Sequence, residues 1–231
     1  MAKKRVTRKE LLKKEDEFIS LSARIYQFVV EHRVQIQWAA ICVLAIMVIV
    51  AGISLYFRHL NIKALAAYNM AYKNLVSDSS HKATEESIQR SAEELDRLIR
   101  EYGLTKMATL AIPQLAYLKF GEGKYDKAIS LYKIYLEKVK TGSIYRSMAY
   151  FGLAACYEAK GEHQSAISYL QKIIENDTTF LKEEATFSLG RVYELSGQRE
   201  LSNDTFRTFT AQFPQSPLLP LAKAHLKNGS Q

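Results

Sequence analysis

The 231-residue sequence contains little cysteine and only scattered histidine. Of its two cysteines, Cys42 lies in a long apolar run and Cys156 lies far beyond it, so the remainder of the chain cannot form an internal disulfide. So low a count fits a reducing or an oxidising compartment. The five histidines are far apart, and none stands at metal-ligand spacing from a cysteine or glutamate. We therefore expect no metal site.

Catalytic motifs are also missing. The sequence has neither a nucleophile elbow nor a zinc-hydrolase helix. Residues 121–124 place two glycines before a lysine, as a phosphate-binding loop does, but the remaining spacing of that loop is absent. We therefore expect no enzyme activity and no cofactor.

The net charge of +8 is concentrated near the amino terminus. Residues 1–33 contain nine Lys and Arg against five Asp and Glu, whereas residues 60–231 contain 22 basic against 19 acidic side chains. A nucleic-acid surface would gather its basic residues on one face of the domain. The distribution argues against nucleic-acid binding and indicates a basic tail that contacts anionic lipid headgroups.

The longest apolar run extends from Trp38 to Phe57 and contains no charged residue and no proline. A helix of this length spans about 30 Å, the thickness of the hydrocarbon core of a bilayer. Ten of its residues are Leu, Ile, Val or Phe, which together favour insertion by about 3–6 kcal/mol. A buried core helix is the alternative. A cleaved signal peptide fits poorly, because a long polar segment precedes the run and no Ala-x-Ala follows it. We predict a retained transmembrane anchor over residues 34–59.

The tail over residues 1–33 is expected to stay in the cytoplasm, because short basic segments do so. Its apolar residues recur at helical spacing and predict an amphipathic helix on the membrane surface, with a mostly disordered tail as the alternative. These residues are Leu11, Phe18, Leu21, Ile25, Phe28 and Val29. Since basic residues close to the anchor are evenly divided between its two sides, the inverted topology remains an alternative.

Beyond the anchor, neither proline nor glycine interrupts residues 53–76, so the membrane helix is expected to continue into the next domain. Residues 77–82 should break it, and a second helix is expected from about Thr84, its N-cap, to Tyr102.

Leu115, Leu153 and Leu189 then begin a repeat. Eight residues after each leucine stands a glycine, thirteen after it a small residue, and seventeen after it a large apolar residue. These are Gly123, Gly161 and Gly197; Ala128, Ala166 and Ser202; and Tyr132, Leu170 and Phe206.

The repeat predicts helical hairpins. The glycine supplies the positive φ that ends the first helix, the small residue allows the second helix to approach it, and the large residue fills the space between them. Such hairpins bury their apolar faces by stacking on one another. We expect an all-α domain over residues 60–227, with hairpins at about 62–102, 106–140, 144–176 and 180–213 and a closing helix at 217–227.

The residues of these hairpins resemble tetratricopeptide repeats. The best copy contains Thr186, Leu189, Gly190, Tyr193, Ser202, Phe206 and Pro214, and the middle copy contains Tyr150, Leu153, Ala154, Tyr157, Ala166 and Leu170. In the first copy Lys119 stands where the family has tyrosine. The resemblance implies an α-solenoid whose concave groove holds segments of partner proteins. Copies are two to four residues longer than the usual period, which leaves the curvature open.

A basic tail, one anchor and an adjacent repeat domain are similar to the YfgM-type ancillary subunits of the bacterial SecYEG translocon. That resemblance implies a non-enzymatic scaffold in the inner membrane. Its amino terminus would lie in the cytoplasm and its repeat domain in the periplasm, where it binds translocon subunits and chaperones. The periplasmic cell-division coordinator CpoB has a related domain, so an envelope-assembly or cell-division scaffold is the alternative, with a cytoplasm-facing recruiter as a further one.

In tetratricopeptide arrays the first helix of each hairpin lines the groove. Applied to this sequence, the resemblance implies a peptide-binding groove formed by Tyr117, Phe120, Phe151, Ala155, Glu158, Phe187, Arg191 and Glu194. Aromatic rings with a few charges suit an apolar peptide. The alternative is that these rings pack against the capping helices or a long loop. Phe151 and Phe187 stand where chaperone-binding repeats place the residues of a carboxylate clamp, which argues against that role.

Overall fold

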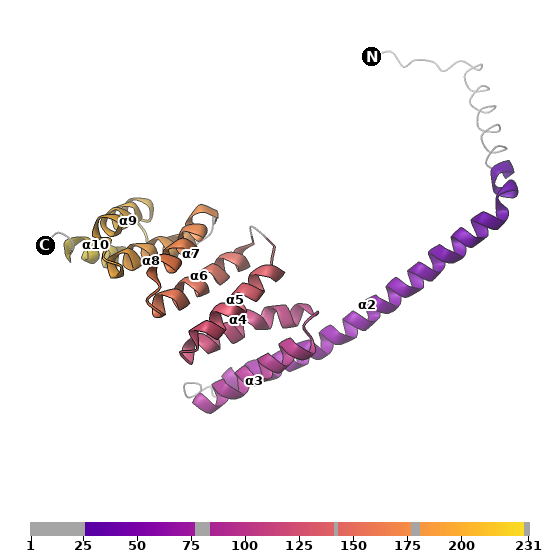
Figure 1. Ribbon diagram of the computed structural model, residues 1–231, viewed down its shortest axis with the longest axis horizontal. Helices are drawn as coiled ribbons and strands as arrows, with labels where there is room; N and C mark the ends of the chain where they lie inside the picture. Colours follow the sequence, from indigo (N-terminus) through magenta and orange to yellow (C-terminus); the bar gives the residue numbers. More distant parts are fainter. Residues whose placement is uncertain (1–25, 77–83, 141–142, 177–180, 229–231) are drawn as a thin grey trace, which may run out of the picture. The chain divides into compact units, whose positions relative to one another are not determined.

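The computed structural model describes residues 26–76, 84–140, 143–176 and 181–228, which are mainly helical and contain no strand (Figure 1). The predicted all-α class is confirmed. The chain divides into two units, residues 1–58 and 59–231. Predictions for residues 1–25 and 77–82, which include most of the amphipathic tail and the break after the first helix, lie outside the described residues. The helices are α2 (Arg33–Val76), α3 (Glu85–Glu101), α4 (Lys106–Gly121), α5 (Tyr125–Lys138), α6 (Ile144–Ala159), α7 (His163–Asn176), α8 (Leu181–Leu195), α9 (Arg199–Gln212) and α10 (Leu219–Asn228).

Helix α2 is continuous over 44 residues, as the absence of glycine and proline from residues 53–76 predicted. In the amino-terminal unit its apolar residues are exposed, and none of the 18 residues in its most apolar window is buried. A core helix of a soluble protein would be mostly buried, so the core alternative does not hold. Within the described part of the chain, α2 is the one helix long and apolar enough to cross a membrane.

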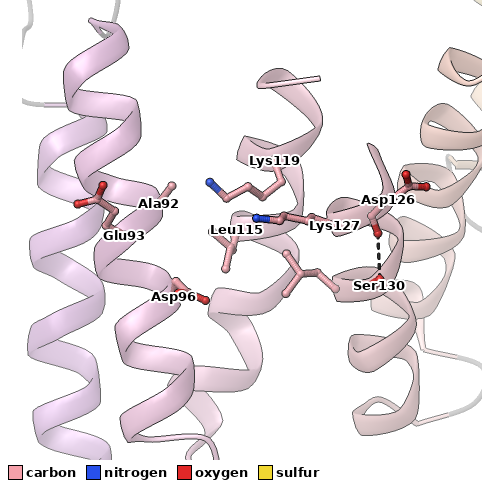
Figure 2. A pocket seen from close by; sticks show the side chains of 9 residues that line it. Ala92, Glu93, Asp96, Leu115, Lys119, Asp126, Lys127 and Ser130 are labelled. Atoms are coloured by element: carbon pink, nitrogen blue, oxygen red, sulfur yellow. Dashed lines mark hydrogen bonds between the residues drawn. The ribbon is translucent and has the colours of Figure 1, made fainter. Parts of the chain in front are cut away.

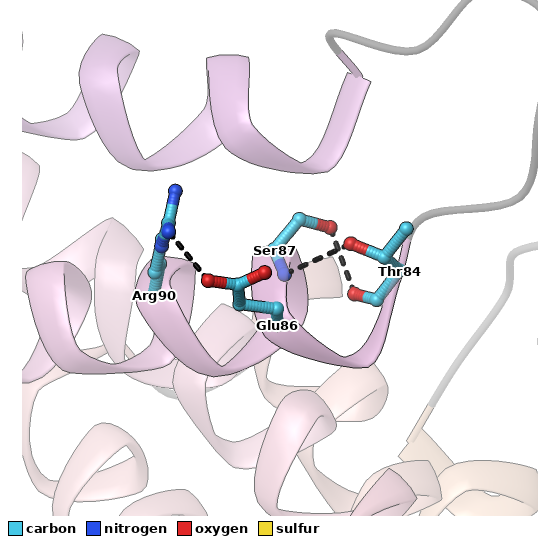
Figure 3. Close-up of polar contacts among 4 residues, drawn as sticks. All are labelled: Thr84, Glu86, Ser87 and Arg90. Atoms are coloured by element: carbon cyan, nitrogen blue, oxygen red, sulfur yellow. Dashed lines mark hydrogen bonds and ion pairs between the residues drawn. The ribbon is translucent and has the colours of Figure 1, made fainter.

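Helix α3 begins where its capping residue predicted. The hydroxyl of Thr84 accepts a hydrogen bond from the backbone N–H of Ser87 at 3.2 Å, and the hydroxyl of Ser87 donates to the carbonyl of Thr84 at 2.8 Å (Figure 3). One turn further on, Arg90 forms an ion pair with Glu86. The Thr84 cap satisfies an N–H at the helix amino terminus that has no partner within the helix. The cap therefore fixes the start of α3, which packs against the end of α2 through the core that holds Ala71 and Ala92.

Three glycines end the first helices of the following hairpins. Gly123, Gly161 and Gly197 follow α4, α6 and α8 and have φ angles of 73°, 76° and 79°. The N–H of the next residue bonds back into each helix, for example from Glu162 to the carbonyl of Tyr157 at 2.8 Å. The glycine turns predicted from the repeat are thus confirmed.

The small and large residues of the repeat pack as expected. Ala128 and Ala166 are fully buried, and the hydroxyl of buried Ser202 donates to the carbonyl of Gly190 at 2.8 Å. A methyl group at Gly190 would lie 2.9 Å from the ring of Phe206, so only glycine leaves room for that ring. Close approach of the paired helices therefore depends on small residues in both of them.

Apolar cores join neighbouring hairpins in the second unit. The first core packs Ala71 of α2 against α3 and α4, and the hydroxyl of buried Ser91 donates to the carbonyl of Ala71 at 2.7 Å. The last core packs Phe206 and Phe209 of α9 against Ala222 of α10. Since each core contains residues from successive hairpins, the hairpins stabilise one another as a stack.

Candidate functional site

The predicted groove residues lie on α4, α6 and α8, the first helices of three hairpins. Their environments differ. Tyr117 and Glu194 are exposed, with 65% of Tyr117 accessible, and the other six are half-buried. The half-buried residues are Phe120, Phe151, Ala155, Glu158, Phe187 and Arg191. The position of a residue in the repeat therefore does not determine how exposed its side chain is.

An apolar cavity of about 330 Å³ lies between α4, α5 and α6. Tyr117 is the single predicted groove residue that lines it. The other lining residues are Leu110, Pro113 and Gln114 of α4, Tyr132 and Tyr135 of α5, and Tyr145, Met148 and Ala149 of α6. Helices α4 and α6 thus contribute residues, between their first and third turns, that fixed offsets from the repeat leucines did not find.

Tyr132 and Tyr135 are the buried tyrosines of this cavity. Only 7% of Tyr132 and 3% of Tyr135 are exposed. The ring of Tyr132 passes against Gly152 of α6, where an added methyl group would lie 2.7 Å from the hydroxyl oxygen. Burial, together with the nearby Cys156 and Tyr117, raises the pKa of Tyr132 to about 12. The phenol therefore stays protonated at neutral pH and can donate a hydrogen bond.

Towards the carboxyl terminus, the corresponding surface is closed by contacts within the chain. The guanidinium of Arg191 on α8 forms a two-point ion pair with Glu158 on α6, with 2.8 Å between Nη2 and Oε2. Glu194 contacts His225 of α10 at 2.6 Å. The charged residues predicted for the groove thus link neighbouring helices of the chain.

The predicted aromatic residues also make contacts within the chain. Phe187 packs against Phe206 and Phe209, with ring centroids 5.6 and 5.7 Å apart. Phe187 also contacts the ring of His225 on the closing helix α10, with centroids 6.0 Å apart. Its place in a peptide-binding groove stays a prediction. Phe151 packs on the core between α6 and α8, and the ring of Phe120 contacts Tyr125 at 5.5 Å.

A second cavity, of about 520 Å³, lies between α3, α4 and α5 (Figure 2). Lys119, the departure from the repeat pattern, stands on its wall and pairs with Glu122 at 2.6 Å. In the next copies the equivalent residues are tyrosines. Tyr157 stacks on Tyr169 with centroids 5.7 Å apart, and the Tyr193 hydroxyl accepts a hydrogen bond from Gln171 at 3.2 Å. The cavity therefore coincides with the one copy that lacks the tyrosine.

The wall of this second cavity carries charges of both signs. Glu93 and Asp96 of α3 line it together with Lys119, Lys127 and Asp126. Asp96 points toward the lysine side of the cavity, whereas the Glu93 carboxylate points the other way (Figure 2). Asp126 also pairs with Lys160 of α6 at 2.7 Å. In the described ranges, no group of three or more His, Cys, Asp or Glu side chains is arranged to hold a metal ion. Within this cavity, the Ser130 hydroxyl donates a hydrogen bond to the backbone carbonyl of Asp126 at 2.9 Å.

Comparison with known proteins identifies a family over most of the chain. The profile of the tetratricopeptide repeat-like domain matches residues 29–214, and a search of curated protein sequences finds no match. A single-substitution variant of the tetratricopeptide-like repeats of a putative kinesin light chain from Podosopora anserina is 15% identical, with a TM-score of 0.60. The alignment covers 74% of this chain and 86% of that one.

Two bacterial structures are also similar. MamA from Desulfovibrio magneticus is 16% identical with a TM-score of 0.55, and the alignment covers 73% of this chain and 89% of that one. A tetratricopeptide repeat protein from Parabacteroides merdae is 17% identical with a TM-score of 0.54, covering 70% and 60% of the two chains. At these identities the likeness concerns the fold of the helical stack.

Proposed function

Because the chain belongs to the tetratricopeptide repeat-like domain family, whose folds are typically non-catalytic scaffolds for protein–protein interaction, we propose that it is a membrane-anchored scaffold of the bacterial envelope. Its repeat domain faces the periplasm and binds protein partners there. Helix α2 anchors it in the inner membrane, and the basic tail over residues 1–33 lies on the cytoplasmic side.

The exposed apolar run of α2 is the observation that carries this proposal. Large side chains such as Val48 and Leu55 are each 65% exposed. Leaving so many apolar side chains in water is unfavourable, by roughly 1.5–3 kcal/mol for each large one. A bilayer is the environment that accommodates a helix apolar on all sides.

The proposed partners come from the resemblance of the sequence to YfgM-type subunits. We infer that the scaffold acts beside the SecYEG translocon and together with periplasmic chaperones. The open apolar surface between α4 and α6 supports a binding role without chemistry. A cell-division or envelope-assembly scaffold is the competing function, and it predicts different partners.

Topology is the first test. Protease added to spheroplasts should digest residues 60–231 and leave the amino-terminal tail protected, because the tail lies inside. Protection of the repeat domain in spheroplasts, with digestion only after lysis, would overturn the periplasmic assignment and favour a cytoplasm-facing recruiter.

Crosslinking identifies the partners. A photoreactive residue at exposed Tyr117 or Tyr145 should capture translocon subunits, chaperones or secreted chains in intact cells. The matched control is Arg207 on α9, whose side chain is also mostly exposed but lies away from the cavity. Capture of division or wall-synthesis proteins instead, concentrated at the division site and independent of secretion, would overturn the translocon role.

A further inference from the structure

The turn between α3 and α4 carries the most exposed large apolar side chain in the described part of the chain. This residue, Leu104, is 83% exposed. It stands between Tyr102, the C-cap of α3, and Thr105, the N-cap of α4. A single exposed leucine is common on protein surfaces, so its position in the molecule decides whether it has a role.

Hydrogen bonds fix the conformation of this turn. The backbone N–H and the hydroxyl of Thr105 both donate to the carbonyl of Tyr102 at 2.8 Å. The Thr105 hydroxyl in turn accepts a hydrogen bond from the N–H of Ala108 at 3.1 Å. Leu104 is therefore exposed on a turn whose neighbouring polar groups are well bonded.

A contact with α2 brings the turn close to the end of the anchor. The N–H of Lys106 donates to the side-chain oxygen of Asn61 at 3.1 Å. Asn61 follows Phe57, the last residue of the apolar run, by four residues, and α2 is helical throughout. Four helical residues rise about 6 Å, which is comparable to the polar layer of about 5–8 Å on each side of the hydrocarbon core. Leu104, two residues before Lys106, is therefore within reach of the bilayer surface.

The side chains of the turn suit a boundary between lipid and water. Leucine gains free energy when it leaves water for the acyl chains, and the long side chain of exposed Lys106 can keep its charge among the headgroups. A stable protein interface needs about 800 Å² on each partner, far more than one leucine supplies. A bilayer accepts a single apolar side chain, so lipid is the better occupant.

We propose that the α3–α4 turn is a second membrane contact of the repeat domain. Leu104 enters the bilayer interface on the side of that domain, and Lys106 lies among the lipid headgroups. Helix α2 and this turn together then limit the angles that the domain adopts relative to the membrane. The proposal rests on the anchoring of α2 in the proposed function but not on the identity of the partners.

Tryptophan fluorescence tests the contact in the full chain, because Trp38 is the single tryptophan of the sequence. The variant Trp38→Phe, Leu104→Trp carries its indole at the turn. The control Trp38→Phe, Leu201→Trp carries it on α9, where Leu201 is 47% exposed. Each protein is placed, as one copy per disc, in phosphatidylcholine nanodiscs with or without bromine atoms near the top of the acyl chains.

We expect the brominated lipid to quench the indole at position 104, whose emission should also be shifted to the blue, and to leave the indole at position 201 unchanged. Equal emission from position 104 in both lipids would overturn the proposal. The design excludes a second copy as the source of the shift, because each disc holds one.

Cysteine labelling measures the same contact independently. Neither native cysteine should react with a membrane-impermeant maleimide. Cys42 lies in the apolar run, and Cys156 is buried at 0% exposure, which raises the pKa of its thiol to about 11. In the same discs Leu104→Cys should react more slowly than Leu201→Cys, although the protein itself leaves position 104 the more exposed of the two. Equal or faster labelling at position 104 would overturn the insertion.

The parent chain separates failure of this proposal from failure of the anchor. Its Trp38 lies at the end of the apolar run and should be quenched in the brominated discs. Quenching of Trp38 without quenching at position 104 would overturn the turn contact alone. No quenching of Trp38 would overturn the anchor and the proposed function with it. Slow labelling of Leu104→Cys without quenching at position 104 would mean that protein rather than lipid covers the turn, and the proposal would fail.

Discussion

Gly161 shows how one residue determines the turn of a hairpin. It has φ of +76°, in the left-handed region that glycine adopts most readily, and no atom lies within 4 Å of the position where a Cβ would stand. Any cost of adding a side chain there is therefore conformational rather than steric, at roughly 1–2 kcal/mol.

Gly161→Ala should lower the free energy of unfolding by about 1 kcal/mol. Gly121→Ala is the control, because Gly121 is equally unobstructed but is the last residue of helix α4 and has no positive φ, so alanine fits its conformation. Urea denaturation of the full chain in detergent, followed by circular dichroism, measures both. Equal effects of the two substitutions would contradict the conformational explanation.

The buried phenol of Tyr132 should make the domain sensitive to alkali. Because burial raises its pKa from about 10 to about 12, the unfolded chain releases this proton at a lower pH than the folded chain. The stability linked to the group is complete below about pH 10 and is lost as the pH rises towards 12, by roughly 2–3 kcal/mol in full. Tyr132→Phe should flatten this decline in denaturant titrations at rising pH, and identical pH slopes would refute the linkage.

The sequence could predict individual positions where local chemistry alone decides the structure. Thr84 caps α3 because its hydroxyl reaches the backbone N–H three residues further on. The repeat glycines end their helices because a glycine backbone adopts positive φ without any contribution from other parts of the chain. The environment of Phe187 could not be predicted in this way, since it depends on where α10 lies. Likewise, the surroundings of the Tyr132 hydroxyl depend on Gly152, in a different helix.

At the scale of helices, the departure of one copy from the repeat creates a cavity. Lys119 and Leu131 line it, whereas the next copy places Tyr157 against Tyr169. The sequence showed that Lys119 departs from the pattern, but the cavity became evident only when α3 and α5 were seen on either side of it. A substitution in one copy of the repeat thus changes how that copy packs against its neighbouring helices.

Lys119→Tyr should fill part of this cavity and stabilise the domain by up to about 1 kcal/mol, because a tyrosine ring buries more apolar area than a lysine stem. Lys119→Tyr removes one ion pair of the half-buried Glu122, but Lys124 still pairs with this carboxylate at 2.7 Å, so its charge keeps a partner. Lys127→Tyr, on the exposed rim of the same cavity, is the control. Thermal unfolding reports the change, and a lower melting temperature for Lys119→Tyr would show that the cavity cannot accept a ring.

Helix α10 closes the stack, and its contribution can be measured with one pair of substitutions. Ala222 is fully buried against Phe206 and Phe209, whereas Ala224 is exposed in the same helix. Ala222→Asp should destabilise the last hairpin by about 2–4 kcal/mol because it buries a charge among aromatic rings. Ala224→Asp should have little effect. Hydrogen exchange of α8 and α9 amides distinguishes the two, and equal protection would mean that α10 is not required.

For the whole molecule, membrane attachment depends on the balance between apolar and charged residues in α2. The apolar residues between Trp38 and Phe57 favour insertion by about 3–6 kcal/mol, and one arginine at the centre costs about 2.5–3.5 kcal/mol. A single Met47→Arg should therefore weaken anchoring only partly. Adding Val50→Arg raises the cost to about 5–7 kcal/mol, which exceeds the middle of the range of the apolar gain.

The double variant Met47→Arg, Val50→Arg should consequently appear in the carbonate-soluble fraction, while the parent chain stays with the membrane. The control carries Met70→Arg and Tyr72→Arg, two exposed positions of α2 beyond the apolar run, and should remain membrane-bound. If the double variant stays in the membrane, the apolar run is not the anchor. Attachment would then have to come from the basic tail or from a bound membrane protein, and raising the salt concentration would distinguish these two because it screens only the charges of the tail.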